Sequence, residues 1–170
     1  MIRAIAISAA ILVTAASTPA LSQQRGNRAL ATVVTAYEQI ARRYDPITAS
    51  SEGDRGALRR MPDASRDAEL AYRAELAALR LRVERVRERG LNEEDALNRS
   101  YLLRVIDQAI ENVDLDFSRA SFGAGGGFLS AISYLAYSTP IQSADDAEAW
   151  LARLEATPTY YAQGAANARR

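Results

Sequence analysis

Two apolar stripes on either side of one glycine constrain the fold of this chain more than any other feature. Large apolar residues recur every three or four positions in both segments, which is the spacing of one helix face. The first stripe holds Tyr72, Leu76, Leu79, Val83 and Val86, and the second holds Leu97, Tyr101, Leu102, Val105, Ile106, Ala109, Ile110 and Val113. We therefore predict helices over residues 65–89 and 92–113. Gly90 is expected to end the first helix as a left-handed cap, and a turn of two or three residues makes the helices antiparallel neighbours.

The charges of the two segments favour the same pairing. Residues 55–89 contain ten arginines and six acids, whereas residues 93–116 contain seven acids and two arginines. A basic helix beside an acidic one is electrostatically complementary. The alternative interpretation is that the arginine-rich helix binds nucleic acid or phosphate. Because its acids are interleaved with its arginines and no set of stacking aromatic residues accompanies them, we predict no nucleic-acid partner.

The segment before this pair also has helical periodicity. Apolar positions over 27–44 lie three or four residues apart, and Asp45-Pro46 is expected to end that helix, because the residue before proline is disfavoured in the α conformation. A long polar loop, with at most one short helical turn, is expected over 47–63.

The segment after the pair is expected to be irregular over 114–127 and then helical. A short apolar helix is predicted over 128–137, and Ser143-Ala144-Asp145-Asp146 is a helix-start signal. Thr157-Pro158 is interpreted as the cap and first residue of a last helix that runs to Arg170. The predicted fold class is all-α: a helical array with an antiparallel helix pair, forming one domain over residues 23–170.

The first 22 residues are typical of a cleavable signal peptide. Arg3 gives a short basic start, an uncharged apolar run covers 5–16, and Pro19 precedes a cleavage site after Ser22. The run is shorter than the ~20 apolar residues of a transmembrane helix. An uncleaved membrane anchor is the alternative, whereas a lipid-modified cysteine is excluded because the chain has no Cys. We expect a mature chain beginning at Gln23, periplasmic or secreted, with no stable membrane anchor.

Missing residue types exclude most catalytic chemistry. The chain has no Cys and no His, and all 21 of its basic residues are arginine. A thiolate nucleophile, a histidine base or ligand, and a lysine Schiff base are therefore impossible. Glu93-Glu94-Asp95 and Asp145-Asp146 lie where helices are expected to begin, and the glycines within 123–127 lack the spacing of a phosphate-binding loop. We predict no catalytic, cofactor-binding or metal-binding residue, and no cofactor in this chain.

A set of landmarks, weakly specific one by one, has a distinctive order and spacing. They are the signal peptide, Tyr44-Asp45-Pro46, Glu52-Gly53-Asp54, the turn from Gly90 to Asp95, Thr139-Pro140-Ile141, the segment from Ser143 to Leu154, and Pro158 to Tyr161. In this order they resemble the start of a large bacterial family of exported proteins, domain of unknown function family 885. That family resembles mostly helical zinc metallopeptidases with an HExxH motif, in which two His and a Glu hold zinc and a second Glu acts on the bound water.

The resemblance implies a part of a longer protein. Because this chain has no His, no zinc ligand or catalytic residue can be carried over, and zinc is implied only for full-length relatives. The first functional hypothesis is a non-catalytic amino-terminal helical region of an exported zinc-metallopeptidase-like protein, truncated before the catalytic motif. The alternative is a stand-alone small helical periplasmic binding or interaction protein, and a weaker third option is a truncated product without function. In the first hypothesis an apolar surface on the last helix and over 128–137 meets the missing catalytic region or another protein surface.

Overall fold

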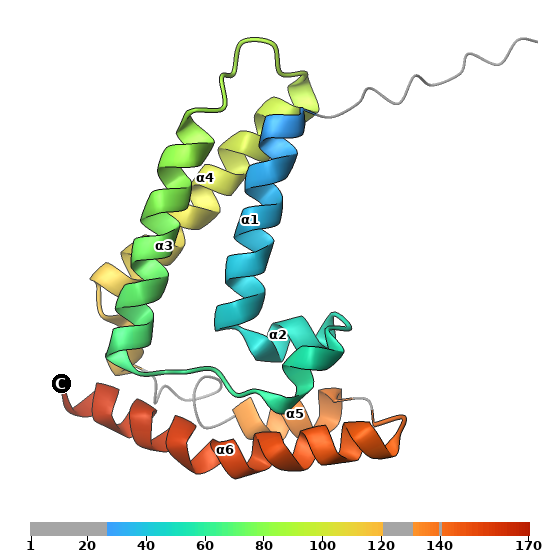
Figure 1. Cartoon of the computed structure of the whole chain (residues 1–170). Helices are drawn as coiled ribbons and strands as arrows, with labels where there is room; N and C mark the ends of the chain where they lie inside the picture. The colour runs from blue at the N-terminus through green and yellow to red at the C-terminus, as the bar shows by residue number, and fades with distance from the viewer. Residues whose placement is uncertain (1–26, 121–130, 140) are drawn as a thin grey trace, which may run out of the picture.

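The computed structural model describes residues 27–120, 131–139 and 141–170, which form helices and no strand (Figure 1). The predicted all-α class is confirmed for these residues. In chain order the elements are α1 (Arg28–Tyr44), α2 (Pro46–Ser51), the 3-10 helix η1 (Arg55–Arg59), α3 (Arg66–Glu84), α4 (Glu93–Asp114), the 3-10 helix η2 (Phe117–Ala120), α5 (Ala131–Ser138) and α6 (Ala144–Arg169).

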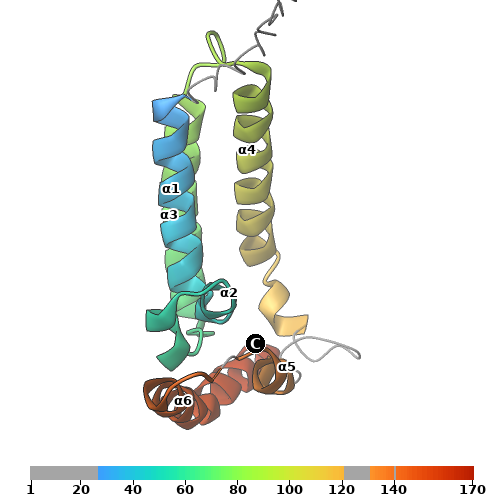
Figure 2. The ribbon, with the colours of Figure 1, turned by 90° about the vertical axis from the view of Figure 1, so that its right-hand side faces the viewer.

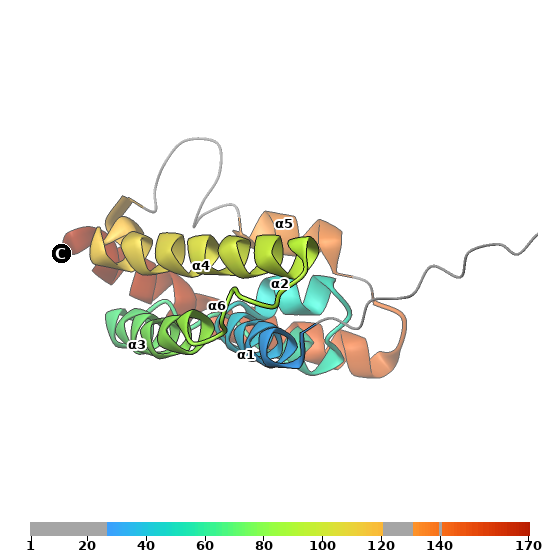
Figure 3. The ribbon, with the colours of Figure 1, turned by 90° about the horizontal axis from the view of Figure 1, so that it is seen from above.

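The hydrophobic core lies where α1 and α4 pack against α3 (Figures 1 and 2). Seen from above, α1 and α3 lie next to each other and α4 extends along both (Figure 3). Leu76, Leu79 and Val83 of the α3 stripe are fully buried. The buried residues that meet them are Leu30, Val33 and Ile40 of α1 and Leu102 and Ile106 of α4.

Ion pairs that α4 makes with α3 and with the connection after α3 give the relative direction of the two helices. Arg73 pairs with Asp114 at 2.5 Å, Arg80 with Asp107 at 2.5 Å, and Arg99 with Glu88 at 2.8 Å. Rising residue numbers along the α3 segment meet falling numbers along α4, so the helices run in opposite directions. The opposite charges of the two segments thus meet across the contact.

The connection between these helices is longer than predicted, because α3 ends at Glu84 and not at Arg89. Arg99 of α4 accounts for the early end. Its Nε donates to the carbonyl oxygen of Val86 at 2.8 Å and its Nη2 to that of Glu84 at 3.4 Å, so a side chain takes carbonyls that further helix would have used. Gly90 has the expected positive φ, 100°, but lies within the connection and does not cap α3.

The predicted loop over 47–63 is partly wrong, because α2 and η1 lie within it. Asp45 ends α1 as expected and also begins α2: its carboxylate accepts from the backbone N–H of Thr48 at 3.0 Å and from its hydroxyl at 2.7 Å. Pro46 occupies the first helical position, where no N–H is needed. Asp54 caps η1 by the same type of contact, at 3.2 Å. Short polar caps therefore turn a loop-like composition into two short helices.

α6 is one continuous helix, so the predicted helix start at Thr157-Pro158 is wrong (Figure 1). Its beginning is as predicted, since the Ser143 hydroxyl accepts from the backbone N–H of Asp146 at 3.2 Å. Pro158 cannot donate to the carbonyl four residues earlier, which is usually costly inside a helix. In the same turn the Thr157 hydroxyl donates to the carbonyl oxygen of Arg153 at 3.2 Å. Buried contacts on both sides of this turn hold α6 against the rest of the molecule.

Some predictions fall on residues that the structure does not describe. The signal peptide over 1–22 and the glycine run lie outside the described residues, and so does the start of the apolar helix predicted over 128–137, whose residues 131–137 lie in α5 as predicted. Within α5, Leu135 is buried, whereas Tyr134 and Tyr137 are 61% and 93% exposed. None of the described helices is both long and apolar enough to cross a membrane.

Candidate functional site between α1 and α4

A groove with a volume of about 700 Å³ lies between the amino-terminal halves of α1 and α4. α1 and α4 both pack on α3 but make few contacts with each other, which leaves the groove open along their length. Its lining consists of Asn27, Leu30, Ala31, Val34, Tyr37 and Glu38 from α1 and its cap, and of Asp95, Asn98, Tyr101, Leu102 and Val105 from α4. The lining mixes aliphatic side chains with two tyrosines, two asparagines and two acids.

The groove exists because both helices have wider apolar faces than α3 can cover. On α1, Leu30 is buried in the core while Val34, one turn later, is only half-buried and lines the groove. On α4, Leu102 is buried, whereas Tyr101 is 67% exposed and Leu97 66% exposed. Apolar side chains that are left at the edge of a core in this way mark an interaction surface.

Two tyrosines, Tyr37 and Tyr101, line the groove. Burial, and then the nearby Tyr101, raises the pKa of Tyr37 above its ordinary value. Burial is also the main cause that raises the pKa of the neighbouring Tyr72 to about 12. Phenols with such pKa values stay protonated at neutral pH and serve as hydrogen-bond donors or apolar surface, not as nucleophiles.

Carboxylates line the edges of the groove and of a second hollow that continues from it. Asp95 accepts a hydrogen bond from the backbone N–H of Asn27 at 2.8 Å. Glu38 lines both hollows and has no ion pair among the described residues. The second hollow, about 330 Å³, also has Asp45 in its lining, together with Arg42 and Glu52, which pair with each other at 3.1 Å. The combined lining carries four acids and one arginine, so its charge is negative.

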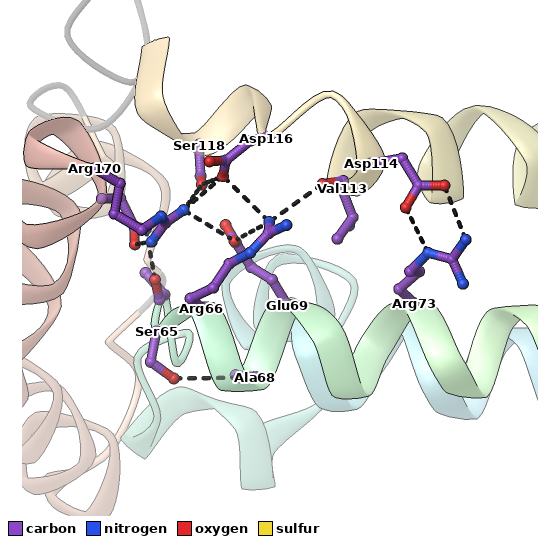
Figure 4. Close-up of polar contacts among 12 residues, drawn as sticks. Ser65, Arg66, Ala68, Glu69, Arg73, Val113, Asp114, Asp116, Ser118 and Arg170 are labelled. Atoms are coloured by element: carbon purple, nitrogen blue, oxygen red, sulfur yellow. Dashed lines mark hydrogen bonds and ion pairs between the residues drawn. The ribbon is translucent and has the colours of Figure 1, made fainter.

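A second polar cluster joins the ends of α3, α4 and α6 (Figure 4). Asp116 has a left-handed backbone, with φ of 52°, and accepts from Arg170 at 2.6 Å while pairing with Arg66 at 3.2 Å. Arg66 also bonds Glu69 at 3.1 Å. The hydrogen bond from Arg170 is the main cause that lowers the pKa of Asp116, so this carboxylate is a poor base. Each acid here faces an arginine, as in a structural ion network.

Two buried charged residues dock α6 on the segment that contains α2 and η1. Asp146 is 2% exposed; it pairs with Arg55 and accepts from the backbone N–H of Gln142 at 2.9 Å. Arg153 is completely buried. Its Nη2 donates to the carbonyl oxygens of Ala57 at 2.6 Å and Pro46 at 3.2 Å, and to a serine hydroxyl.

The acids singled out in the sequence do begin helices, but two of them have further roles. Glu93-Glu94-Asp95 occupy the first turn of α4 and Asp145-Asp146 that of α6, as expected. Asp95 also bonds the cap of α1, and Asp146 holds Arg55 across 91 positions of sequence. Neither contact has a local sequence signal. Sequence reasoning also missed the groove itself and the buried Arg153.

Comparison with known proteins identifies the family. Residues 46–170 match the model of a family described as "Bacterial protein of unknown function (DUF885)". The chain belongs to this family. No match was found among curated proteins or among solved structures.

The DUF885 match begins at the first residue of α2, so α1 lies before it. Of the landmarks that carried the resemblance, those from Pro46 onward lie inside the match, and the signal peptide lies outside. Five of the eleven residues that line the groove therefore belong to the family region, and six, from α1 and its cap, do not.

The residues of this chain do not fit zinc. The sequence has no His or Cys, and the described residues contain no group of three acids placed to hold a metal ion. Zinc sites in proteins are built mainly from imidazole and thiolate ligands, and isolated carboxylates favour hard cations. No step of zinc chemistry can therefore be assigned to the side chains described.

Proposed function

We propose that this chain is the non-catalytic amino-terminal helical region of an exported, zinc-metallopeptidase-like protein. The observation that carries the proposal is membership of DUF885 over residues 46–170, combined with the resemblance of that family to helical metallopeptidases. The absence of His, Cys and Lys from the sequence supports a non-catalytic role, because the usual ligands and bases of such chemistry are missing.

In this proposal the helices are a preformed wall for the catalytic region. The buried core that α3 shares with α1 and α4 and the polar docking of α6 make the wall rigid, as positioning of a site requires. The groove between α1 and α4 supplies a surface for that region or for another protein. The amino-terminal segment directs export, so the mature chain would begin at Gln23.

The test is the reading frame that follows codon 170. An open frame with an HExxH motif downstream is expected, and the extended protein should bind zinc and cleave peptides while the 170-residue chain does neither. Mass spectrometry of protein from the periplasm or medium should give Gln23 as the first residue. A stop codon at this point in all close relatives would overturn the proposal, as would stoichiometric zinc on the dialysed 170-residue chain.

A second function, a stand-alone periplasmic binding protein, is favoured by one observation. The groove volume of about 700 Å³ lies within the range of ordinary ligand sites, ~300–1,000 Å³. This function predicts that relatives of the same length exist and that the purified chain is a cooperative monomer which does not bind a hydrophobic dye. Light scattering with dye binding distinguishes the two, because a part of a larger protein should self-associate or bind the dye.

A further inference from the structure

The form of the groove points to an elongated occupant. Its lining on α1 runs from Asn27 to Glu38, and the adjoining hollow continues it to Asp45. At 1.5 Å per residue this is about 27 Å of helix. A compact ligand would fill only the part between α1 and α4, whereas a helix of about 18 residues matches the combined length of the groove and the adjoining hollow.

The packing of the three core helices favours a helix as well. α3 contacts both α1 and α4, while α1 and α4 contact each other little, so the groove lies between two nearly unpaired helix faces. Val34 of α1 and Val105 of α4 line it from opposite sides, and Tyr101 of α4 is 67% exposed. A fourth helix in this position would complete a bundle in which every helix has two neighbours.

The charge of the lining decides the chemistry of that helix. Glu38, Asp45 and Asp95 line the two hollows, and the arginine beside them is already paired with Glu52. Glu38 has no ion-pair partner in the described part of the chain, and its side chain is exposed at the junction of the two hollows. The same chain already packs a basic helix, α3, against the acidic α4. An occupant that reaches these carboxylates needs arginine or lysine beside its apolar stripe.

We propose that the groove between α1 and α4 docks an amphipathic helix that carries arginine or lysine next to an apolar stripe. The source to which we assign it, resting on the proposed function, is the catalytic region of the same protein. Apolar residues at i, i+3, i+4 and i+7 contact Val34, Tyr101 and Val105, and the basic side chains meet Glu38 and Asp95.

The test uses two synthetic peptides and the purified 170-residue chain. Both peptides are 18-residue helices with the same leucine stripe; one has arginines beside the stripe and its twin has glutamates there. Binding is measured by fluorescence anisotropy at low and high salt. The arginine peptide is expected to bind at least tenfold more tightly than its twin, and the difference should shrink in 1 M salt because screening weakens the charge contacts.

Variants at exposed positions separate the groove from the rest of the surface. Tyr101→Arg should weaken binding of the arginine peptide at least tenfold, and Glu38→Arg should weaken it while strengthening binding of the twin. Leu81→Arg is the matched control, because Leu81 lies on α3, is 54% exposed and does not line the groove. Since all three positions are exposed, the variants should keep the melting temperature of the wild type, which circular dichroism checks.

Several results would overturn the inference. They are equal binding of the two peptides, no binding of either, or equal loss of binding in Tyr101→Arg and the Leu81→Arg control. Self-association that Tyr101→Arg abolishes would assign the groove to a second copy of the chain instead. These outcomes can be told apart from a failure of the proposed function. If an HExxH motif follows in the reading frame but neither peptide binds, only the docking proposal is refuted. If the arginine peptide binds but no such motif follows, only the assignment of the helix to the catalytic region is refuted.

Discussion

Replacement of the buried Arg153 by methionine is predicted to leave the free energy of unfolding within about 1 kcal/mol of the wild type, or to raise it. Arg153 is 0% exposed, and Nε and Nη1 of its guanidinium have no hydrogen-bond partner among the described residues. Burial, and then the positive charge of Arg60, lowers the pKa of the group, so the folded protein disfavours the charge that it holds.

The magnitude follows from the contacts that are lost and the penalties that are removed. The three contacts of Nη2, made by a charged donor, contribute about 1.5–3 kcal/mol each, whereas the two unsatisfied nitrogens cost at least about 1–3 kcal/mol each and burial of the charge costs several kcal/mol more. The acceptors also keep other partners: the carbonyl oxygen of Ala57 accepts from Arg60 N–H at 3.0 Å, and the Ser50 hydroxyl donates to Ile47 at 2.8 Å. Methionine fills most of the volume, so the two sums nearly cancel.

Urea unfolding followed by far-UV circular dichroism measures the effect, with Arg153→Ala as the companion variant. Arg153→Ala removes the same contacts but leaves a cavity, so it should be less stable than Arg153→Met by about 2–5 kcal/mol. Equal m-values for all three proteins would show that only stability changes. A loss above about 2 kcal/mol in Arg153→Met would refute the reasoning, because the guanidinium would then be worth more than its contacts with the described residues explain.

Three further predictions concern the fold. Val83→Asp should lower the free energy of unfolding by about 4 kcal/mol or more, because it puts an unpaired charge in the core. The control, Leu81→Asp at an exposed position of α3, should change it by under about 0.5 kcal/mol. Equal effects of the two variants would mean that the stripe is not buried. Asp146→Asn should lower the melting temperature above pH 4 and have less effect as the pH falls below the ordinary carboxyl value of 3.8. Arg55 and then the Gln142 N–H lower the pKa of Asp146, so its contribution is lost only in acid; an effect of constant size down to pH 2 would contradict this. Gly90→Ala should lower the free energy of unfolding by about 1 kcal/mol, because alanine is strained at a φ of 100° even though no atom lies near the added Cβ. An unchanged melting temperature would show that the turn adjusts freely.

Local signals predicted most of the helices, and long-range contacts explain where they failed. Ser143 caps α6 as predicted, and Asn27 and Asn92 cap α1 and α4 by the same local contact, because a cap needs only residues three positions apart. The end of α3 was missed because Arg99, thirteen residues beyond Val86, takes its carbonyl. The continuity of α6 was missed for a related reason: contacts with residues about a hundred positions away outweigh the break expected at Pro158.

The groove was nevertheless implicit in the widths of the two stripes. The stripe of the α3 segment has five large apolar positions in a single narrow row, the last of them just beyond the end of α3, whereas the stripe of α4 has eight apolar positions, which spread over two adjacent rows. One helix cannot cover both rows, so the row that contains Leu102 and Ile106 packs on α3 and the row that contains Tyr101 and Val105 is left at its edge. The sequence alone does not reveal which helix shares that edge, because the position of α1 beside α4 depends on their common packing against α3. An apolar stripe that is too wide for the next helix in the chain to cover therefore indicates a further helix partner. The peptide-binding experiment tests this inference directly.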